Sequence, residues 1–331
     1  MEEHPVRFAL MIEAQQGLTY EDQLSIARRA EAGGFETLFR SDHYASFPGD
    51  ANQVTTDAWA ILAGLARETQ TIGLGTLVSP VTFRHPGNFV KLVTTVDQMS
   101  GGRLEVGVGA GWNEADHDPL GLPFPSIAER ADLMEDQLAL LHGLWEEAPG
   151  WEYNGHQVVV RGGRLVPGPV QSAGRPIGAD GRARPRIITG SEGSPRGFRL
   201  AARYSDEFNL SSSTPEIALE KQAQLDAACV AADRDPKSLT RSAMVGVLIG
   251  TDAAEVDRRA TTLLEALGES GDGRAWLDKR RSRWIIGTPD EARAMVQRYA
   301  EAGIERIMLQ DLLPWDGEMI DLMAQELIGR V

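Results

Sequence analysis

Short apolar segments alternate with longer amphipathic ones along most of this chain. Residues 6–12 are apolar, and residues 19–32 then carry apolar side chains at helical spacing before Gly33 and Gly34. Thr19 with Asp22 forms a variant of the helix-capping box. A second short apolar segment, residues 35–39, follows. The first forty residues therefore predict a strand, a helix and a second strand.

The same alternation continues to the end of the chain. Strands are expected at residues 6–12, 35–39, 72–78, 104–108, 186–189, 207–210, 243–249 and 306–310. Helices are expected at residues 19–32, 57–68, 86–99, 125–145, 197–204, 215–233, 253–267, 289–302 and 317–328. Eight strands alternating with helices predict a closed (β/α)8 barrel, with an open doubly wound sheet as the alternative.

Two stretches break this rhythm and are interpreted as insertions in a single domain of residues 1–331. Residues 148–185 are rich in Gly and Pro and contain a short alternating piece, residues 156–160, which favours a small hairpin. Residues 268–286 are expected to form a long loop. Neither stretch has the length and pattern of a second domain.

Composition and net charge limit the kinds of molecule that the chain is expected to bind. The chain has 331 residues, 42% of them hydrophobic, and a formal net charge of -15, which argues against nucleic acid and anionic membranes as partners. Cys229 is the single cysteine, so no disulfide within the chain and no cysteine-rich metal site is expected. The start of the sequence lacks the pattern of a secretory signal, and no apolar run would span a bilayer. We therefore expect a soluble cytoplasmic protein.

Polar residues follow two of the predicted strands. Asp42 and His43 come directly after the second strand, where a barrel places its catalytic rim, and an imidazole there exchanges a proton near neutral pH. A loop aspartate beside an exposed histidine is the simpler interpretation of these residues. Pro80 ends the third strand and predicts a bend or a bulge in residues 76–80.

Glycines and hydroxyl residues mark two further strand ends. The run from Gly107 to Gly111 is not a dinucleotide fingerprint, because its third glycine is misplaced and no helix follows at once. It either lets a flat ring approach the backbone or allows close packing within the protein. Residues 189–195 precede a helix and suit either an anion site or a simple capping loop.

Three other features carry less weight. The basic residues 279–283, among them Arg280, Arg281 and Arg283, fit an anion clamp or a solvated loop. Asp116, His117 and Asp118 resemble a hard-metal set without a second ligand cluster, and no metal site is expected. The chain contains no G-x-S-x-G nucleophile elbow, so hydrolysis through a covalent intermediate is poorly supported.

Taken together, the segments FRSDH, GLGTLVSPVTFRHPGNFVKLVTTVDQMSGGR and EVGVGAGWNEAD resemble the luciferase-like monooxygenase superfamily. The resemblance spans nearly the whole chain and is strongest to the branch of oxidoreductases that use the deazaflavin coenzyme F420. It implies a (β/α)8 barrel with insertions, a homodimer, and a flavin or deazaflavin ring lying against a bulge that contains a non-prolyl cis peptide bond.

The resemblance also implies roles for individual residues. His43 corresponds to the acid–base residue, and Asp42 to a catalytic neighbour that contacts the ring or its ribityl chain. The cis-peptide bulge corresponds to Leu77 and Val78. The other expected cofactor contacts are Thr76, Ser79, Gly109, Ala110, Gly111, Trp112 and, at the phosphate, Gly190, Ser191 and Gly193. Trp112 stands where some relatives carry a glutamate, and Arg40 stands where an apolar residue is expected.

The resulting hypothesis is hydride transfer between coenzyme F420 and a small organic substrate, with His43 moving the accompanying proton. One alternative is a monooxygenase that uses reduced FMN and oxygen on the same barrel. Another is a flavin-binding protein without catalysis. The substrate and the direction of the reaction are not encoded in any motif of the sequence.

Overall fold

The computed structural model describes residues 5–170, 184–211 and 213–331. Within them, eight parallel strands form the barrel: β1 (Arg7–Ile12), β2 (Thr37–Arg40), β3 (Gly73–Pro80), β4 (Leu104–Gly109), β7 (Arg186–Ser191), β8 (Glu207–Ser211), β9 (Thr240–Ile249) and β11 (Arg306–Asp311). Each of these strands pairs with its neighbour, and β9 pairs with both β8 and β11, which closes the ring of eight strands. The predicted (β/α)8 barrel is confirmed, and the open doubly wound sheet is wrong.

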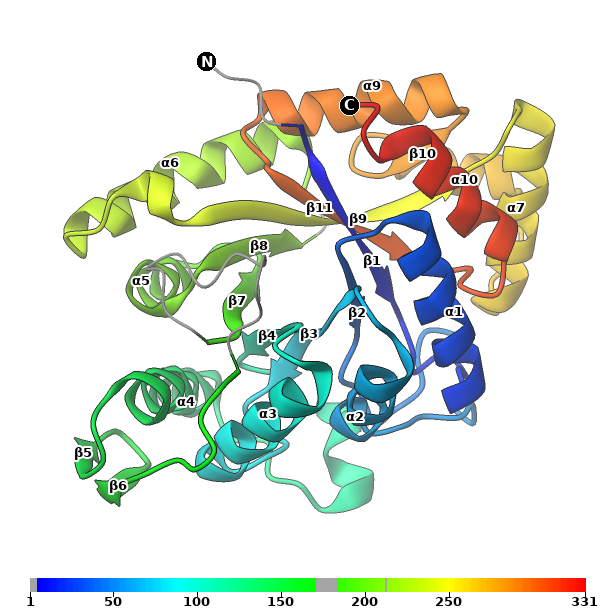
Figure 1. Ribbon diagram of the computed structural model, residues 1–331. Helices are drawn as coiled ribbons and strands as arrows, with labels where there is room; N and C mark the ends of the chain where they lie inside the picture. Colours follow the sequence, from blue (N-terminus) through cyan, green and yellow to red (C-terminus); the bar gives the residue numbers. More distant parts are fainter. Residues whose placement is uncertain (1–4, 171–183, 212) are drawn as a thin grey trace.

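Helices surround the barrel, as Figure 1 shows. They are α1 (Tyr20–Gly33), α2 (Ala58–Glu68), α3 (Pro86–Ser100), α4 (Ile127–Glu146), α5 (Pro195–Tyr204), α6 (Pro215–Ala231), α7 (Ala253–Ala266), α9 (Pro289–Glu301) and α10 (Gly317–Leu327). The predicted capping box of Thr19 and Asp22 opens α1, and Gly34 closes it with a φ of 83°. No helix in the described part of the chain is long and apolar enough to cross a membrane.

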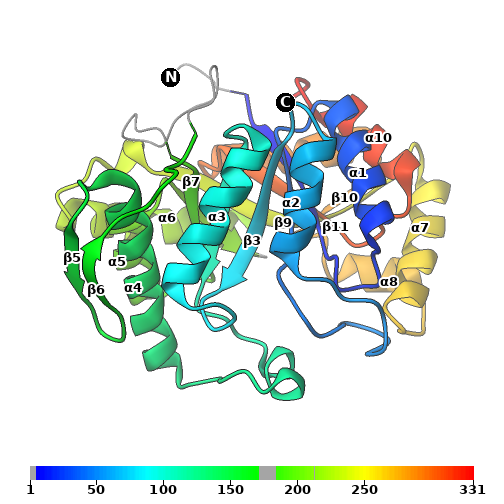
Figure 2. The same ribbon diagram turned by 60° about the horizontal axis from the view of Figure 1, so that its bottom comes forward.

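The two insertions have structure of their own. The described part of residues 148–185 forms an antiparallel hairpin of β5 (Trp151–Asn154) and β6 (Val159–Gly163), which lies beside α4 (Figures 1 and 2). Residues 171–183 lie outside the described residues. The stretch 268–286, expected to be a loop, contains the helix α8 (Gly273–Asp278) and the start of the strand β10 (Ile285–Gly287), which pairs with the end of β9. These elements have six and three residues, too few to show a periodic pattern.

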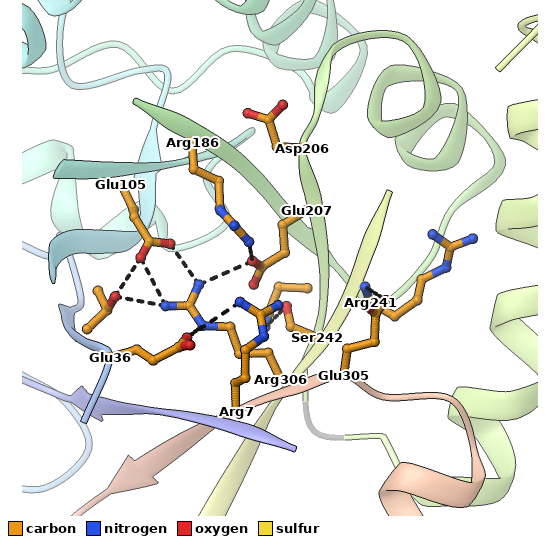
Figure 3. A network of polar contacts seen from close by, with 12 residues as sticks. Arg7, Glu36, Glu105, Arg186, Asp206, Glu207, Arg241, Ser242, Glu305 and Arg306 are labelled. Carbon is orange, nitrogen blue, oxygen red and sulfur yellow. Dashed lines mark hydrogen bonds and ion pairs between the residues drawn. The ribbon is translucent and has the colours of Figure 1, made fainter. Parts of the chain in front are cut away.

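The interior of the barrel has an apolar layer over a charged one. The apolar layer consists of Ala9, Met11, Phe39, Leu77, Ile188 and Met308. The charged layer lies at the beginnings of the strands, where Arg306 of β11 meets Glu105 of β4 and Glu207 of β8 (Figure 3). Side chains thus fill this end of the barrel, and barrels of this kind bind their ligands at the opposite end, where the strands finish.

The charged layer is a continuous network. Arg306 is 1% exposed and donates to both carboxylate oxygens of Glu105 over 2.7 and 2.9 Å. It also lies 3.2 Å from Glu207, which Arg186 approaches to 2.9 Å. Arg7 and Glu36 complete the set at its exposed side. Three arginines thus balance three glutamates, as buried charges require.

Candidate functional site

The third strand carries the predicted bulge. The pairing of β3 with β4 shifts between Thr76 and Ser79, and the peptide bond between Leu77 and Val78 is cis. This confirms the cis bond that the family resemblance implies. Val78 is half-buried, at the end of the barrel opposite the charged network.

Two glycines of β4 make room for this bulge. A Cβ atom on Gly107 would lie 2.1 Å from the carbonyl oxygen of Thr76, and one on Gly109 would lie 2.5 Å from Val78 Cγ2. Of the two interpretations of the glycine run, close packing within the protein therefore describes these two positions. Ala110 and Gly111 follow at the rim and are half-buried.

Asp42 lies behind the bulge and is completely buried. Its Oδ2 accepts hydrogen bonds from Ser79 Oγ and from Arg84 Nη1, each at 2.6 Å. Ser79 in turn accepts from Trp59 Nε1 at 2.8 Å and lies 3.1 Å from Thr76 Oγ1. The Asp42 carboxylate thus supports the bulge through Ser79. Its hydrogen bonds come from donors within the protein.

Arg84 is a site residue to which the sequence analysis assigned no role. Its guanidinium lies between Asp42 and Asp57, 2.5 Å from Asp57 Oδ2, and it also donates to the Tyr44 hydroxyl at 3.0 Å. Burial acts to raise the pKa of Asp57, but the charge of Arg84 and hydrogen bonds lower it overall. Arg84 therefore joins the loop after β2, the start of α2 and the segment after β3.

His43 faces a carboxylate from another loop. Its Nδ1 lies 2.6 Å from Asp116 Oδ2, and the His43 side chain is 16% exposed. The other oxygen of Asp116 accepts the backbone N–H groups of Tyr44 and Ala45 at 2.9 and 2.7 Å. The Nε2 atom of His43 makes no hydrogen bond to any residue that the structure describes. Figure 2 shows the loops after β2 and β4, which carry these residues, at the end of the barrel to which the β3 arrow points.

Two aromatic rings contact this imidazole. Phe47 meets His43 edge to face with ring centres 4.6 Å apart, and Trp112 lies 5.7 Å from it. Phe47 and Trp112 are themselves 5.5 Å apart. Trp112 is 68% exposed. The imidazole therefore has two apolar rings beside it in addition to its carboxylate partner.

Four polar side chains at the same rim were assigned no role by the sequence analysis. Gln310, from the end of β11, donates to Glu13 at 2.5 Å, and Gln15 donates to Glu13 at 3.0 Å. Ser41 donates to Gln15 at 2.5 Å. Glu13 and Gln15 follow β1 directly, so their place after a predicted strand was the signal that could have found them.

The candidate phosphate turn lies after β7. Gly193 has a φ of 88°, and its N–H donates to Ser191 Oγ at 3.1 Å. Ser194 caps α5 by accepting from the N–H of Gly197, and Pro195 is the first residue of that helix. Lys221 of α6 donates to the Gly193 carbonyl at 3.1 Å. The turn thus has a cation beside a helix N-terminus, a combination that suits an anion.

The basic cluster has local partners. Arg280 stacks on Trp276, with its guanidinium carbon 3.2 Å from the ring centre, and Arg281 pairs with Asp278 at 2.8 Å. Arg283 is exposed. No described contact joins these arginines to His43.

His117 and Arg40, which the sequence analysis also singled out, make hydrogen bonds within the protein. His117 is buried between Thr82 Oγ1 and the Asn113 carbonyl, at 2.7 and 2.9 Å. In the described part of the chain, no group of three or more His, Cys, Asp or Glu side chains is arranged to hold a metal ion. Arg40 is buried and donates to Gln23 and Thr56, and burial lowers its pKa to about 10. It anchors the loop that precedes α2, which explains a cation at a position expected to be apolar.

Comparison with known proteins gives a consistent result. Residues 4–306 match a protein-family model described as luciferase-like monooxygenase. An F420-dependent glucose-6-phosphate dehydrogenase of Beutenbergia cavernae is 26% identical over 329 residues, which cover 94% of this chain and 93% of that protein.

Two solved structures have the same fold. An F420-dependent secondary alcohol dehydrogenase, solved with an F420-acetone adduct, superposes with a TM-score of 0.79 at 20% identity, covering 98% of this chain and 99% of that one. The monooxygenase RslO1 from Streptomyces bottropensis gives the same TM-score, identity and coverage. At this identity, the structural likeness establishes the barrel alone.

Proposed function

Because this chain belongs to the luciferase-like monooxygenase family, we propose that it is an oxidoreductase that transfers a hydride between coenzyme F420 and a small organic substrate. One observation carries the proposal: His43 offers an unengaged Nε2 atom at the rim of a barrel whose third strand carries a cis-peptide bulge. The choice of F420 is supported by the names of the relatives, which act with this cofactor.

The residues around the bulge fit such a cofactor. Leu77 and Val78 would lie behind its ring, with Thr76 and Ser79 beside them and Asp42 supporting Ser79 from below. The segment from Gly109 to Trp112 would run along the cofactor. Gly190, Ser191 and Gly193, with Lys221, would hold its phosphate. When bound, the deazaflavin supplies the carbon that accepts or donates the hydride.

His43 would manage the proton. In the oxidising direction its Nε2 takes the proton of a substrate hydroxyl, and in the reducing direction it returns a proton to the forming oxygen. Phe47 and Trp112 would exclude water from this exchange and orient an organic substrate against the imidazole. The protein thus contributes binding, orientation and a proton.

The variant His43→Ala tests this role. We expect turnover of oxidised F420 with a panel of secondary alcohols and phosphorylated sugars to fall by about 10²–10⁴, while F420 affinity stays near that of the parent protein. The matched control is His156→Ala, since His156 lies on the β5–β6 hairpin segment and is 48% exposed. Equal turnover in the parent protein and His43→Ala would remove His43 from the mechanism.

The FMN monooxygenase is the second candidate, because the family model that the chain matches is described as luciferase-like monooxygenase. Titration of the protein with each cofactor, followed by tryptophan quenching, separates the two. Micromolar binding of FMN without binding of F420 would overturn the F420 proposal. Tight cofactor binding without turnover of any donor would favour the non-catalytic flavin-binding protein.

We further propose that the protein is a cytoplasmic homodimer with no nucleic-acid or membrane partner. The acidic charge of -15 supports the last point. Light scattering on the purified protein measures the mass of the assembly, and a monomeric mass would contradict the dimer.

A further inference from the structure

We propose that Asp116 is a positioning residue that fixes the tautomer of His43, with the proton on Nδ1 and the lone pair of Nε2 directed to the substrate. The inference rests on the proposed function of His43. It adds a residue that neither the family resemblance nor any sequence motif assigned to proton transfer.

The first argument is the direction of the hydrogen bond. Asp116 Oδ2 lies 2.6 Å from His43 Nδ1, and the Asp116 side chain is 2% exposed. Burial acts to raise the pKa of Asp116, but the hydrogen bond and charge of His43 and two backbone N–H groups lower it overall. An ionised carboxylate only accepts hydrogen bonds, so Nδ1 must carry the proton. In the neutral imidazole, Nε2 is then the basic atom.

The second argument is the rigidity of the carboxylate. Its other oxygen accepts the N–H groups of Tyr44 at 2.9 Å and Ala45 at 2.7 Å, the two residues that follow His43. Asp116 therefore cannot rotate without breaking bonds to the same loop that carries the imidazole. Asp116 thus links the loops after β2 and β4 by three hydrogen bonds.

The consequence for the reaction is a defined path for the proton. A substrate hydroxyl would give its proton to Nε2, and the C–H and O–H bonds of the alcohol would break as its carbonyl forms. The bound deazaflavin would supply the acceptor for the hydride that leaves the carbon. His43 becomes an imidazolium whose Nδ1–H stays on Asp116, and the adjacent negative charge stabilises it. In the reverse direction the same proton returns from Nε2.

The variant Asp116→Asn separates position from charge. Its amide oxygen can still accept the hydrogen bonds of the two backbone N–H groups, while its NH₂ group donates a hydrogen bond to Nδ1. His43 must then carry its proton on Nε2 and has no lone pair for a hydroxyl. We expect kcat for alcohol oxidation to fall by about 10²–10⁴, with F420 affinity changed by less than about threefold.

The decisive measurement is nitrogen NMR on protein labelled at histidine, with His43→Ala identifying the signal. The neutral imidazole should be the Nδ1–H tautomer in the parent protein and the Nε2–H tautomer in Asp116→Asn. Asp118→Asn is the control, because it removes a charge from the same loop at an exposed position. A cooperative thermal unfolding transition in each variant is the check that the variant is folded.

The outcomes separate the two proposals. Loss of turnover in both His43→Ala and Asp116→Asn, together with the tautomer exchange, supports the positioning role. An unchanged tautomer in Asp116→Asn, or full kcat there while His43→Ala is inactive, overturns the role of Asp116 and leaves the proposed function intact. Full turnover in His43→Ala overturns the function of His43 instead.

Discussion

Breaking the charged layer at the beginnings of the barrel strands should destabilise the protein strongly. In Glu105→Gln the shape is kept, but Arg306, which is 1% exposed, loses the carboxylate that takes two of its hydrogen bonds. Three arginines would then face two glutamates. Removing one partner of a buried pair costs about 3–5 kcal/mol, because the remaining charge is uncompensated.

This cost can be expressed as a melting temperature. An unfolding entropy of about 2.1 cal/mol/K per residue gives about 0.7 kcal/mol/K for the 331-residue chain. The expected decrease in Tm is therefore about 4–7 °C, measured by circular dichroism at neutral pH. The control Glu216→Gln breaks an exposed pair with Arg298, whose side chains are 68% and 47% exposed, and should not change Tm measurably.

The double variant Glu105→Gln/Arg306→Met sharpens the test. It restores the balance of charge in the layer, so it should be less destabilised than the sum of the two single variants. The contribution of Glu105 to stability also depends on pH in a definite direction. Burial acts to raise the pKa of Glu105, but Arg306 lowers it overall, so its contribution is present above the unfolded value of about 4.3 and is lost as the pH falls below it. A Glu105→Gln variant that melts with the parent protein and with Glu216→Gln would refute the reasoning.

Two further perturbations test other parts of the structure. Burial raises the pKa of Asp311 to about 7, above its unfolded value of about 3.9, so stability falls as pH rises between these values; Asp311→Asn should raise Tm more at pH 8 than at pH 5. An equal change at both pH values would contradict this. In Gly107→Ala the new Cβ would lie 2.1 Å from a backbone oxygen of the bulge, so we expect about 1–3 kcal/mol of destabilisation and weaker F420 binding. Gly168→Ala, whose Cβ would meet nothing within 4 Å, is the control, and equal losses in the two variants would argue against the packing explanation.

The architecture could be predicted from the sequence because its signals are local. Each barrel strand is a short apolar segment followed by a helix with its own cap, as at Thr19 and Ser194. The cis bond between Leu77 and Val78 came from the family resemblance, since no local propensity predicts it. The elements α8 and β10 were missed because their patterns are too short.

The partners within the site could not be predicted, because they are distant in the chain. Asp116 reaches His43 across 73 positions, and Arg84 reaches Asp42 across 42. Only the closed barrel brings these loops together. The charged layer did leave a trace, because Glu105, Arg186, Glu207 and Arg306 each stand at the first or second position of a strand and are directly followed by an apolar residue. Charges in that position predict an inward-facing polar layer once the barrel is known.

The charged layer, a ring of charges at the beginnings of the strands, also separates the parts of this barrel that can vary from the strand stagger that must stay constant. A slip of one residue in β4, β8 or β11 would turn its charged side chain to the outside and leave the opposite charge alone in the interior. The ring therefore fixes the stagger of the strands from one end only. Loops at the other end can lengthen, shorten or exchange residues during evolution without altering that stagger, so new substrates can be acquired on an unchanged frame.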